Sequence, residues 1–203
     1  MDGQTIKAMM LAVANVMDAN RDMLCALDGQ IGDADHGIAM AGGFGAVRDA
    51  LADFNGTPTD AFNTTAKAFL NAVGASSGPL YATAFMRAGM AVKGKDTLDD
   101  ADAATMIAAM AEGIAHRGKA NVGDTTMLDA WQPAADAAQA AGGESFGGIL
   151  RAAAKAAETG ADATADLEAK LGRAARLGAR SIGHKDPGAV SAAMMLRAMS
   201  NAV

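Results

Sequence analysis

Aromatic residues, proline and cysteine are all scarce in this sequence. Aromatics make up 4% of the 203 residues, proline occurs 4 times, and Cys25 is the single cysteine. One cysteine excludes an internal disulfide and is typical of a protein from a reducing compartment. Since strands favour aromatic and β-branched residues, the shortage of aromatics also argues against a sheet-rich fold. Cys25 lies in an apolar stretch, and we interpret it as a packing residue rather than a nucleophile.

Positive charge is limited as well. The sequence has 17 Lys and Arg residues against 23 Asp and Glu residues, which gives a net charge of −6. Without a basic run it lacks the electrostatic footprint of a nucleic-acid-binding protein, and we expect no nucleic-acid partner. If a phosphorylated ligand binds such an acidic chain, divalent cations and backbone amides must supply the local positive charge.

Long apolar runs are missing too. None approaches the ~20 residues needed to cross a bilayer, and no basic region precedes the first apolar stretch. The sequence therefore predicts a cytoplasmic protein without a membrane span.

Helix-forming residues are abundant. Hydrophobic residues reach 51%, mainly Ala, Met, Leu and Val, and the first three have the best helix propensities. From Ile6 to Leu27 the apolar residues recur at steps of three and four, the period of an amphipathic helix. The same period predicts eight helices in one domain, residues 1–203, and no strand: 6–27, 36–54, 60–73, 79–92, 98–117, 125–141, 145–171 and 187–203.

Local signals at the helix ends agree with this division. Thr97 with Asp100 resembles a capping box, and Pro79 and Pro187 suit a first helical position. The seventh helix contains Gly160, but one glycine costs only about 1 kcal/mol relative to alanine, so we predict that the helix continues through it.

The connections between the predicted helices are of two kinds. Those after the second, fourth and sixth helices look like ordinary turns. The other four, here called the first to fourth rim loops, are rich in glycine and polar residues and span residues 27–36, 74–78, 118–126 and 172–188. In an up-and-down bundle of antiparallel helices, every second connection lies at the same end. We therefore predict an all-α, eight-helix antiparallel bundle or barrel whose rim loops meet at one end.

The first rim loop places Asp28, Asp33 and Asp35 among glycines. Mg²⁺ prefers oxygen ligands and keeps part of its shell for water and substrate phosphates, so this cluster suits a metal and nucleotide site. An EF-hand is excluded, because Ala39 and Phe44 occupy the positions where its bidentate glutamate is needed. The alternative is a solvated turn in which Asp35 caps a helix.

The other rim loops have phosphate-binding character. Ser76 and Ser77 precede a helix N-terminus, where free backbone N–H groups attract anions, although for this loop taken alone a simple helix cap is the favoured explanation. The third loop also opens a helix with Asp and Thr. In the fourth, Arg173 offers charge for a nucleotide, and Asp186 is either a cap or a ribose partner. His36, beside the acidic cluster, is interpreted as a contact to phosphate or to a carboxylate.

Two familiar nucleotide motifs are not satisfied. The stretch from Gly89 to Asp96 matches Gly-x4-Gly-Lys, but Asp96 stands where a P-loop needs Ser or Thr, and no strand precedes it. The glycines at 42, 43 and 45 do not match a dinucleotide fingerprint, and we interpret them as sites of close helix packing.

The rim loops resemble those of the nucleotide-binding L subunit of bacterial dihydroxyacetone kinase. The resemblance runs through the four segments 31–37, 74–81, 117–127 and 172–189, in this order along essentially the whole chain. It implies an eight-helix antiparallel barrel that holds ADP, or ATP, and two Mg²⁺ ions at one end. One departure is Ala39, where relatives commonly have Asn, which removes a possible side-chain contact.

Site residues follow from the resemblance position by position. It implies that the metals are bound by Asp28, Asp33 and Asp35. It also implies a nucleotide pocket formed by His36, Gly37, Ile38, Ala39, Ser76, Ser77, Gly118, Met127, Arg173, Asp186, Pro187 and Gly188.

The resemblance also implies a function and partners. The sugar would be held on a separate K subunit, and bound ADP would be a retained coenzyme recharged by a phosphohistidine protein of the phosphotransferase system. One alternative is an ATP-dependent kinase subunit for another small ketose or tetrose. An alternative of another class is a non-catalytic helical module that binds lipid in its apolar interior.

Overall fold

The structure, a computed structural model, describes residues 1–74 and 76–203. Ala75, which belongs to the second rim loop, lies outside the described residues. Within those two ranges the chain forms α-helices and short 3-10 helices, and no strand. The elements are α1 (Gly3–Ala19), α2 (Arg21–Asp28), α3 (His36–Ala50), α4 (Pro58–Ala72), α5 (Ser77–Ala91), α6 (Asp100–Gly118), α7 (Leu128–Ala140), α8 (Phe146–Ala163), η1 (Thr164–Asp166), η2 (Ala174–Ser181) and α9 (Pro187–Asn201).

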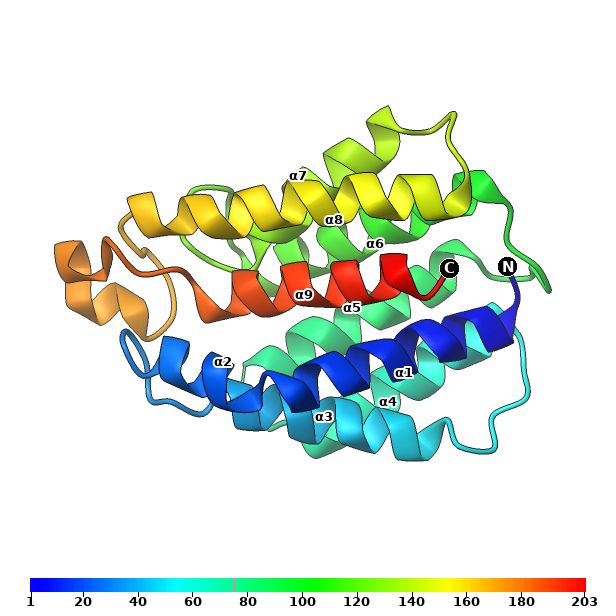
Figure 1. Cartoon of the computed structure of the whole chain (residues 1–203), viewed down its shortest axis with the longest axis horizontal. Helices are drawn as coiled ribbons and strands as arrows, with labels where there is room; N and C mark the ends of the chain where they lie inside the picture. Colours follow the sequence, from blue (N-terminus) through cyan, green and yellow to red (C-terminus); the bar gives the residue numbers. More distant parts are fainter. Residues whose placement is uncertain (75) are drawn as a thin grey trace.

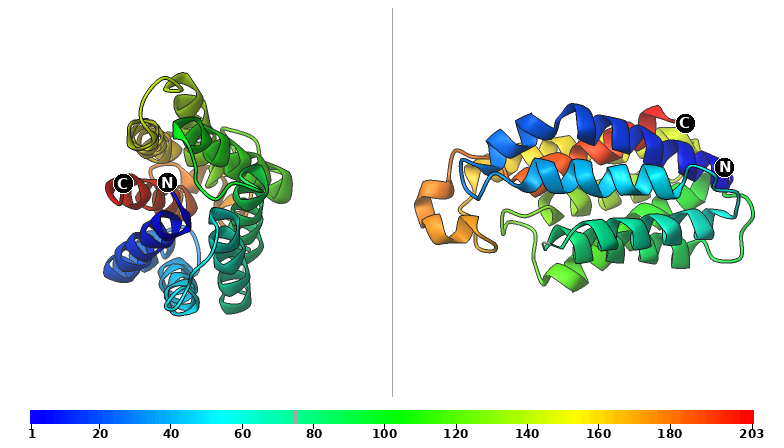
Figure 2. Two further views of the ribbon diagram at one scale, coloured as in Figure 1. Left: turned by 90° about the vertical axis from the view of Figure 1, so that its right-hand side faces the viewer. Right: turned by 90° about the horizontal axis from the view of Figure 1, so that it is seen from below.

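The long helices form a closed antiparallel ring. From α3 onward each long helix packs against the next, α1 packs against α3, and α9 returns to pack against α1. The end-on view in Figure 2 shows this ring, and Figure 1 shows the helices running side by side along the long axis. The interior is filled with apolar side chains, among which the rings of Phe44, Phe69, Tyr81 and Phe85 pack against one another, mostly edge to face. The predicted all-α barrel is therefore confirmed.

The first predicted helix is wrong in one respect, because it divides at Asn20 into α1 and α2. The Asn20 side-chain amide donates to the carbonyl of Val16 at 2.8 Å. Such local side-chain bonds to the backbone compete with regular helix geometry. After this break α2 packs against α3 and α9 and ends at Asp28. The break thus orients the segment that carries the first acidic residue.

Three predicted helix starts also need correction. The capping box before α6 is formed by Asp99 and Asp102, each of which accepts a backbone N–H of the other, and not by Thr97 and Asp100. Pro79 is the third residue of α5 rather than the first, whereas Pro187 does begin α9, with Asp186 as its N-cap. The helix predicted from residue 125 begins only at Leu128.

The seventh predicted helix, α8, runs through Gly160 as expected but ends at Ala163 rather than near residue 171. The buried hydroxyl of Thr164 donates to the carbonyl of Ala161 at 2.6 Å and accepts the backbone N–H of Asp186 at 2.9 Å. These two bonds turn the chain out of the helix and join it to the start of α9. Residues 164–186 instead form η1, η2 and loops at the end of the barrel where the rim loops lie (Figure 1).

In the described ranges, no helix has both the length and the apolar character required to cross a bilayer.

Candidate functional site

The four rim loops lie at the same end of the barrel, as predicted. They lead directly into α3, α5, α7 and α9, so four helix N-termini face this end (Figure 1). The first N–H groups of a helix have no partner within it, and the helix dipole is positive at this end. The arrangement supplies positive electrostatic potential from the backbone of an acidic protein, which favours binding of a phosphate group.

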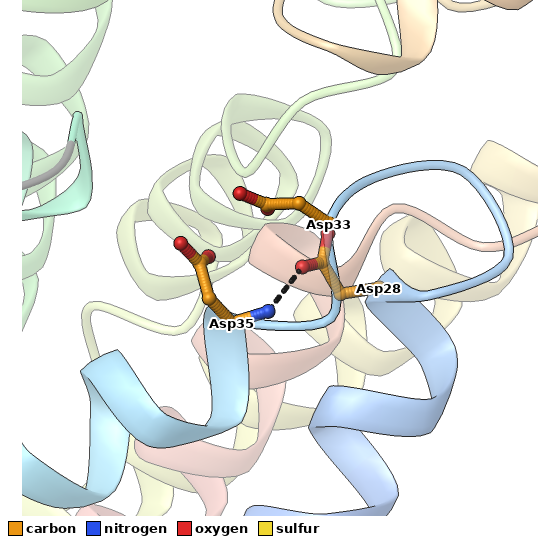
Figure 3. A group of neighbouring side chains, drawn as sticks. All are labelled: Asp28, Asp33 and Asp35. Atoms are coloured by element: carbon orange, nitrogen blue, oxygen red, sulfur yellow. Dashed lines mark hydrogen bonds between the residues drawn. The ribbon is translucent and has the colours of Figure 1, made fainter.

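Three carboxylates gather in the first rim loop. Asp28 ends α2, Asp33 lies in the loop and Asp35 directly precedes α3, and Figure 3 shows their side chains together. Each can contribute one oxygen to a group whose atoms all lie within 4.8 Å of one another. Mg²⁺ binds oxygen at about 2.0–2.1 Å and favours carboxylates, so the type and spacing of these donors fit a magnesium site.

Asp28 is the anchor of this cluster. It is 8% exposed, and its Oδ2 accepts the backbone N–H groups of Asp35 at 3.0 Å and His36 at 3.3 Å. Gly32 lies so close that a Cβ on it would meet Asp28 Oδ1 at 2.1 Å. The loop therefore needs a glycine at this position to fold around the Asp28 carboxylate.

The fourth rim loop brings a cation to the cluster. Arg173 forms an ion pair with Asp33, and its Nη1 lies 3.9 Å from a carboxylate oxygen of Asp35. All three side chains are about half exposed, at 54%, 42% and 52% respectively. A guanidinium and two carboxylates thus meet at the mouth of the site, where each remains accessible to a ligand.

The rim loops enclose a pocket of about 680 Å³, within the range of sizes that hold small-molecule ligands. All four loops contribute to its wall. The predicted residues in the wall are Asp28, Asp33, Asp35, His36, Ala39, Ser76, Ser77, Gly118, Met127, Arg173, Asp186, Pro187 and Gly188.

Two predicted residues are not part of this wall. Gly37 is buried against α2, where a Cβ would meet the carbonyl of Arg21 at 1.9 Å. Ile38 is 62% exposed and lies in the first turn of α3. The structure places neither Gly37 nor the Ile38 side chain in the pocket wall. Their contact with a nucleotide stays a prediction.

Asp129 holds the third rim loop in shape. One of its carboxylate oxygens accepts the N–H of Gly123 at 2.5 Å and the other accepts that of Thr126 at 2.8 Å. Thr125 between them has a left-handed backbone with φ 60°, which is rare for a β-branched residue. Asp129 is 5% exposed. Through its two hydrogen bonds this buried carboxylate holds in place the segment that carries Met127 into the pocket wall.

Asp124 joins the third rim loop to Lys170, in the segment just before the fourth rim loop. Its carboxylate accepts the N–H of Asn121 at 2.8 Å and pairs with Lys170 at 3.3 Å. These two partners lower the pKa of Asp124 and keep it charged. The backbone N–H of Lys170 also donates to the Asp124 carbonyl at 3.1 Å. In addition, His184 Nδ1 lies 2.9 Å from Gln30 Oε1, which connects the fourth loop to the first.

Asp186, in the pocket wall, has a carboxyl group whose pKa is strongly raised. Its Oδ2 accepts the N–H of Ala189 at 2.7 Å as the N-cap of α9. The residue is only half-buried, but loss of water around the carboxylate raises its pKa to about 7, and the nearby charges of Asp129 and Asp28 act in the same direction. The N–H groups of Ala189 and Gly188 oppose this shift.

His36 points into the barrel wall behind the pocket. Its Nε2 lies 2.9 Å from Ser191 Oγ on α9. Burial lowers the pKa of His36 and so favours the neutral imidazole, although the charge of Asp28 and the carbonyl of Pro187 oppose the shift. The predicted contact of His36 with a carboxylate is made through its backbone N–H and not through its ring.

Some residues of the site escaped the sequence analysis. The pocket wall also includes Leu80, Ile114 and Leu171, whose apolar character gives no signal of a site. Asp129 and Ser191 were missed because they lie inside helices, where only the folded ring brings them to the loops.

A comparison with known families matches residues 30–201 to the DAK2 domain. The ADP-binding subunit DhaL of PEP-dependent dihydroxyacetone kinase 1 from Listeria innocua is 40% identical over 89% of this chain and 86% of its own length. The corresponding subunit from Escherichia coli is 36% identical over 92% of this chain and 90% of its own length.

The chain is also similar to one part of longer proteins. L-erythrulose 1-kinase of Mycolicibacterium smegmatis is 35% identical over 97% of this chain, which spans 35% of that enzyme. The crystal structure of dihydroxyacetone kinase from C. freundii in complex with AMP-PNP and Mg²⁺ matches with a TM-score of 0.74 and 25% identity, over 98% of this chain and 34% of that one. With the domain match covering most of the sequence, the chain belongs to the DAK2 domain family.

Proposed function

We propose that this chain is the nucleotide- and magnesium-binding subunit of a dihydroxyacetone kinase. It holds ADP or ATP for phosphoryl transfer to dihydroxyacetone bound on a separate K subunit. The observation that carries the proposal is the meeting of the acidic cluster, Arg173 and four helix N-termini around one pocket. The names of relatives that match most of their length, as ADP-binding subunits of such kinases, agree with it.

The residues divide the work by their chemistry. Asp28, Asp33 and Asp35 would hold two Mg²⁺ ions, because hard oxygen donors suit this cation. Bound Mg²⁺ would neutralise the charge of the β- and γ-phosphates and of the group in transfer. Arg173 donates from its planar guanidinium to phosphate oxygens, and the N–H groups at the start of α5 and α9 add further donors.

The apolar side of the pocket suits the base of the nucleotide. Leu80, Ile114 and Leu171 supply apolar surface in the pocket wall. An adenine ring packed there would lose water without leaving a charge unpaired. Met127, which is 7% exposed, would complete the enclosure.

We further propose that ADP stays bound and is recharged by a phosphohistidine-carrying protein of the phosphotransferase system. The relatives from Listeria innocua and Escherichia coli are named as PEP-dependent enzymes, which supports this route. A subunit of an ATP-dependent kinase for another ketose is the second candidate, since an L-erythrulose kinase is 35% identical.

Calorimetric titration with ADP, with and without Mg²⁺, tests the proposal directly. We expect tight binding with Mg²⁺ and much weaker binding in EDTA. No binding under either condition would instead favour an apolar-ligand-binding module.

The rate at which bound ADP exchanges with labelled ADP separates the two kinase routes. Retention over many turnovers supports a coenzyme, whereas exchange faster than turnover supports a kinase that uses free ATP. Dihydroxyacetone and erythrulose assayed side by side with candidate K subunits identify the substrate.

A further inference from the structure

A buried polar cluster lies directly behind the pocket. Ser191 Oγ on α9 lies 2.9 Å from His36 Nε2 on α3 and 3.2 Å from the Tyr81 hydroxyl on α5. Ser191 and Tyr81 are both 0% exposed. The Ser191 hydroxyl therefore joins three of the four helices that begin at the pocket, each within its first turns.

The hydrogen atoms of this cluster can be assigned by counting. A serine hydroxyl donates one hydrogen bond and accepts two. Ser191 Oγ also lies 3.0 Å from the carbonyl of Gly188, which can only accept, so the single Ser191 proton goes there. His36 Nε2 and the Tyr81 hydroxyl must then both donate to Ser191. In this arrangement Ser191 uses its one proton and both of its acceptor positions.

We propose that Ser191 and Tyr81 are positioning residues that hold the His36 imidazole in one orientation and in its Nε2–H form. Only one nitrogen of a neutral imidazole carries a proton, so Nδ1 is left as a hydrogen-bond acceptor. This deepens the proposed function, on which its relevance to nucleotide binding rests.

The assignment restricts what His36 recognises. An unprotonated ring nitrogen repels the oxygen of a phosphate and attracts a group that carries a proton. On a nucleotide, His36 Nδ1 would accept a hydrogen bond from a hydroxyl group and not from a phosphate oxygen. This reverses the simpler expectation that the ring donates to phosphate.

Nuclear magnetic resonance of the ¹⁵N-histidine-labelled protein tests the cluster without any nucleotide or metal. The sequence has 3 histidines, so the signals of His36 are identified by their loss in His36→Ala. We expect the parent protein to give the pattern of a single tautomer with the proton on Nε2. In Ser191→Ala we expect averaging between the two tautomers, because the acceptor is lost.

Ser200→Ala is the matched control. Ser200 lies on the same helix, is 2% exposed, and also donates to the carbonyl three residues before it, Arg197, at 2.9 Å. It lies at the other end of α9, so the His36 signals should not change. A parent spectrum with the proton on Nδ1, or a Ser191→Ala spectrum identical to the parent's, would overturn the proposal.

A double-mutant cycle on the release of Mg²⁺·ADP tests whether Ser191 acts through His36. One hydrogen bond contributes about 0.5–1.5 kcal/mol, so Ser191→Ala should speed release by about 2- to 10-fold. In a His36→Ala background the same change should have no effect. An equal effect in both backgrounds would mean that Ser191 acts through general packing, and would contradict the proposal.

Tyr81→Phe gives an independent variant, because it removes only the hydroxyl and keeps the ring stacking. We expect the same direction of change in the His36 spectrum and in ADP release. If the parent protein fails to bind ADP at all, the proposed function falls, while the spectra still decide whether the cluster orients His36.

Discussion

Arg173 forms an ion pair with Asp33 across the mouth of the pocket, although the two residues come from opposite ends of the sequence. The same guanidinium lies 3.9 Å from Asp35. Arg173 is thus a protein cation in contact with two carboxylates proposed to bind Mg²⁺. A bound Mg²⁺ ion would compete with the guanidinium for these carboxylates, and a phosphate group would attract both cations.

This competition predicts opposite effects of Arg173→Ala on two ligands. Mg²⁺ alone should bind at least as tightly as to the parent, because its carboxylates lose a competitor. Mg²⁺·ADP should bind about 10- to 100-fold more weakly, since charge-assisted hydrogen bonds contribute roughly 1.5–3 kcal/mol. Calorimetry of each ligand provides the measurement. Arg176→Ala is the control, because Arg176 lies exposed in the neighbouring η2 segment and is not in the pocket wall. Weakening of both ligands to the same degree would argue against a competition.

Asp33→Ala should abolish metal-dependent retention of ADP and leave the helical circular dichroism intact. Asp33 is exposed, so its loss should change the free energy of unfolding by no more than about 0.5 kcal/mol. Asp53→Ala, an exposed carboxylate in the turn after α3, serves as the comparison. Retention of ADP and Mg²⁺ at the parent's level by the Asp33 variant would remove this residue from the metal site.

The helical regions were predictable, but several of their boundaries were not. The capping-box pattern is a capping residue followed three positions later by an acidic one. Thr97 with Asp100 and Asp99 with Asp102 both fit this pattern. The structure uses the second pair, where Lys95 adds an ion pair to Asp102 at 2.7 Å. Likewise, Asn20 is only slightly worse than other residues within a helix, so the break after α1 left no strong signal.

The parts of the site that come from one short stretch of sequence were predictable, whereas the contacts between distant stretches were not. Asp28, Asp33 and Asp35 are neighbours in the sequence, and their clustering could be inferred directly. The contacts that Arg173 and Ser191 make depend on the closure of the ring and on the helical register, which a single sequence does not specify. For the same reason the exposed position of Ile38 was not foreseen.

Stability should depend on pH through Asp186. Its pKa is about 7 in the folded protein and near 3.8 when unperturbed. Between these values the folded state binds more protons than the unfolded chain, so the contribution of Asp186 to stability falls as pH rises towards 7 and is level above it.

Asp186→Asn removes this dependence and keeps an oxygen to cap α9. We expect the melting temperature of the variant to rise relative to that of the parent as pH increases from 5 to 8. Both are measured without nucleotide and with EDTA. A difference between the two melting temperatures that stays constant over this range would contradict the assignment.

Gly160 packs against the start of α7, where a Cβ would meet the Asp129 carbonyl oxygen at 2.0 Å. Since that atom belongs to the backbone, Gly160→Ala should shift α7 and lower the free energy of unfolding by about 1–3 kcal/mol. It should also weaken ADP binding, because Asp129 holds the third rim loop.

Gly42→Ala is the matched change within a helix, since a Cβ there meets nothing within 4 Å. It should raise the free energy of unfolding by up to about 1 kcal/mol, owing to the better helix propensity of alanine. Urea unfolding of both variants measures the contrast, and equal stability of the two would refute the packing argument. The predicted close packing is therefore wrong for Gly42 and Gly45, whose surroundings are open. It is confirmed for Gly43, where a Cβ would meet the Phe69 ring at 2.4 Å.

Both chain termini lie at the end of the barrel away from the rim loops (Figures 1 and 2). The backbone of Leu98, in the turn at that end, accepts a hydrogen bond from the amino group of Met1. α6 alone has 19 residues, a length of roughly 28 Å at 1.5 Å per residue. A tether or affinity tag on either terminus therefore leaves the pocket open, and a domain fused there would need a linker about as long as the barrel to reach it.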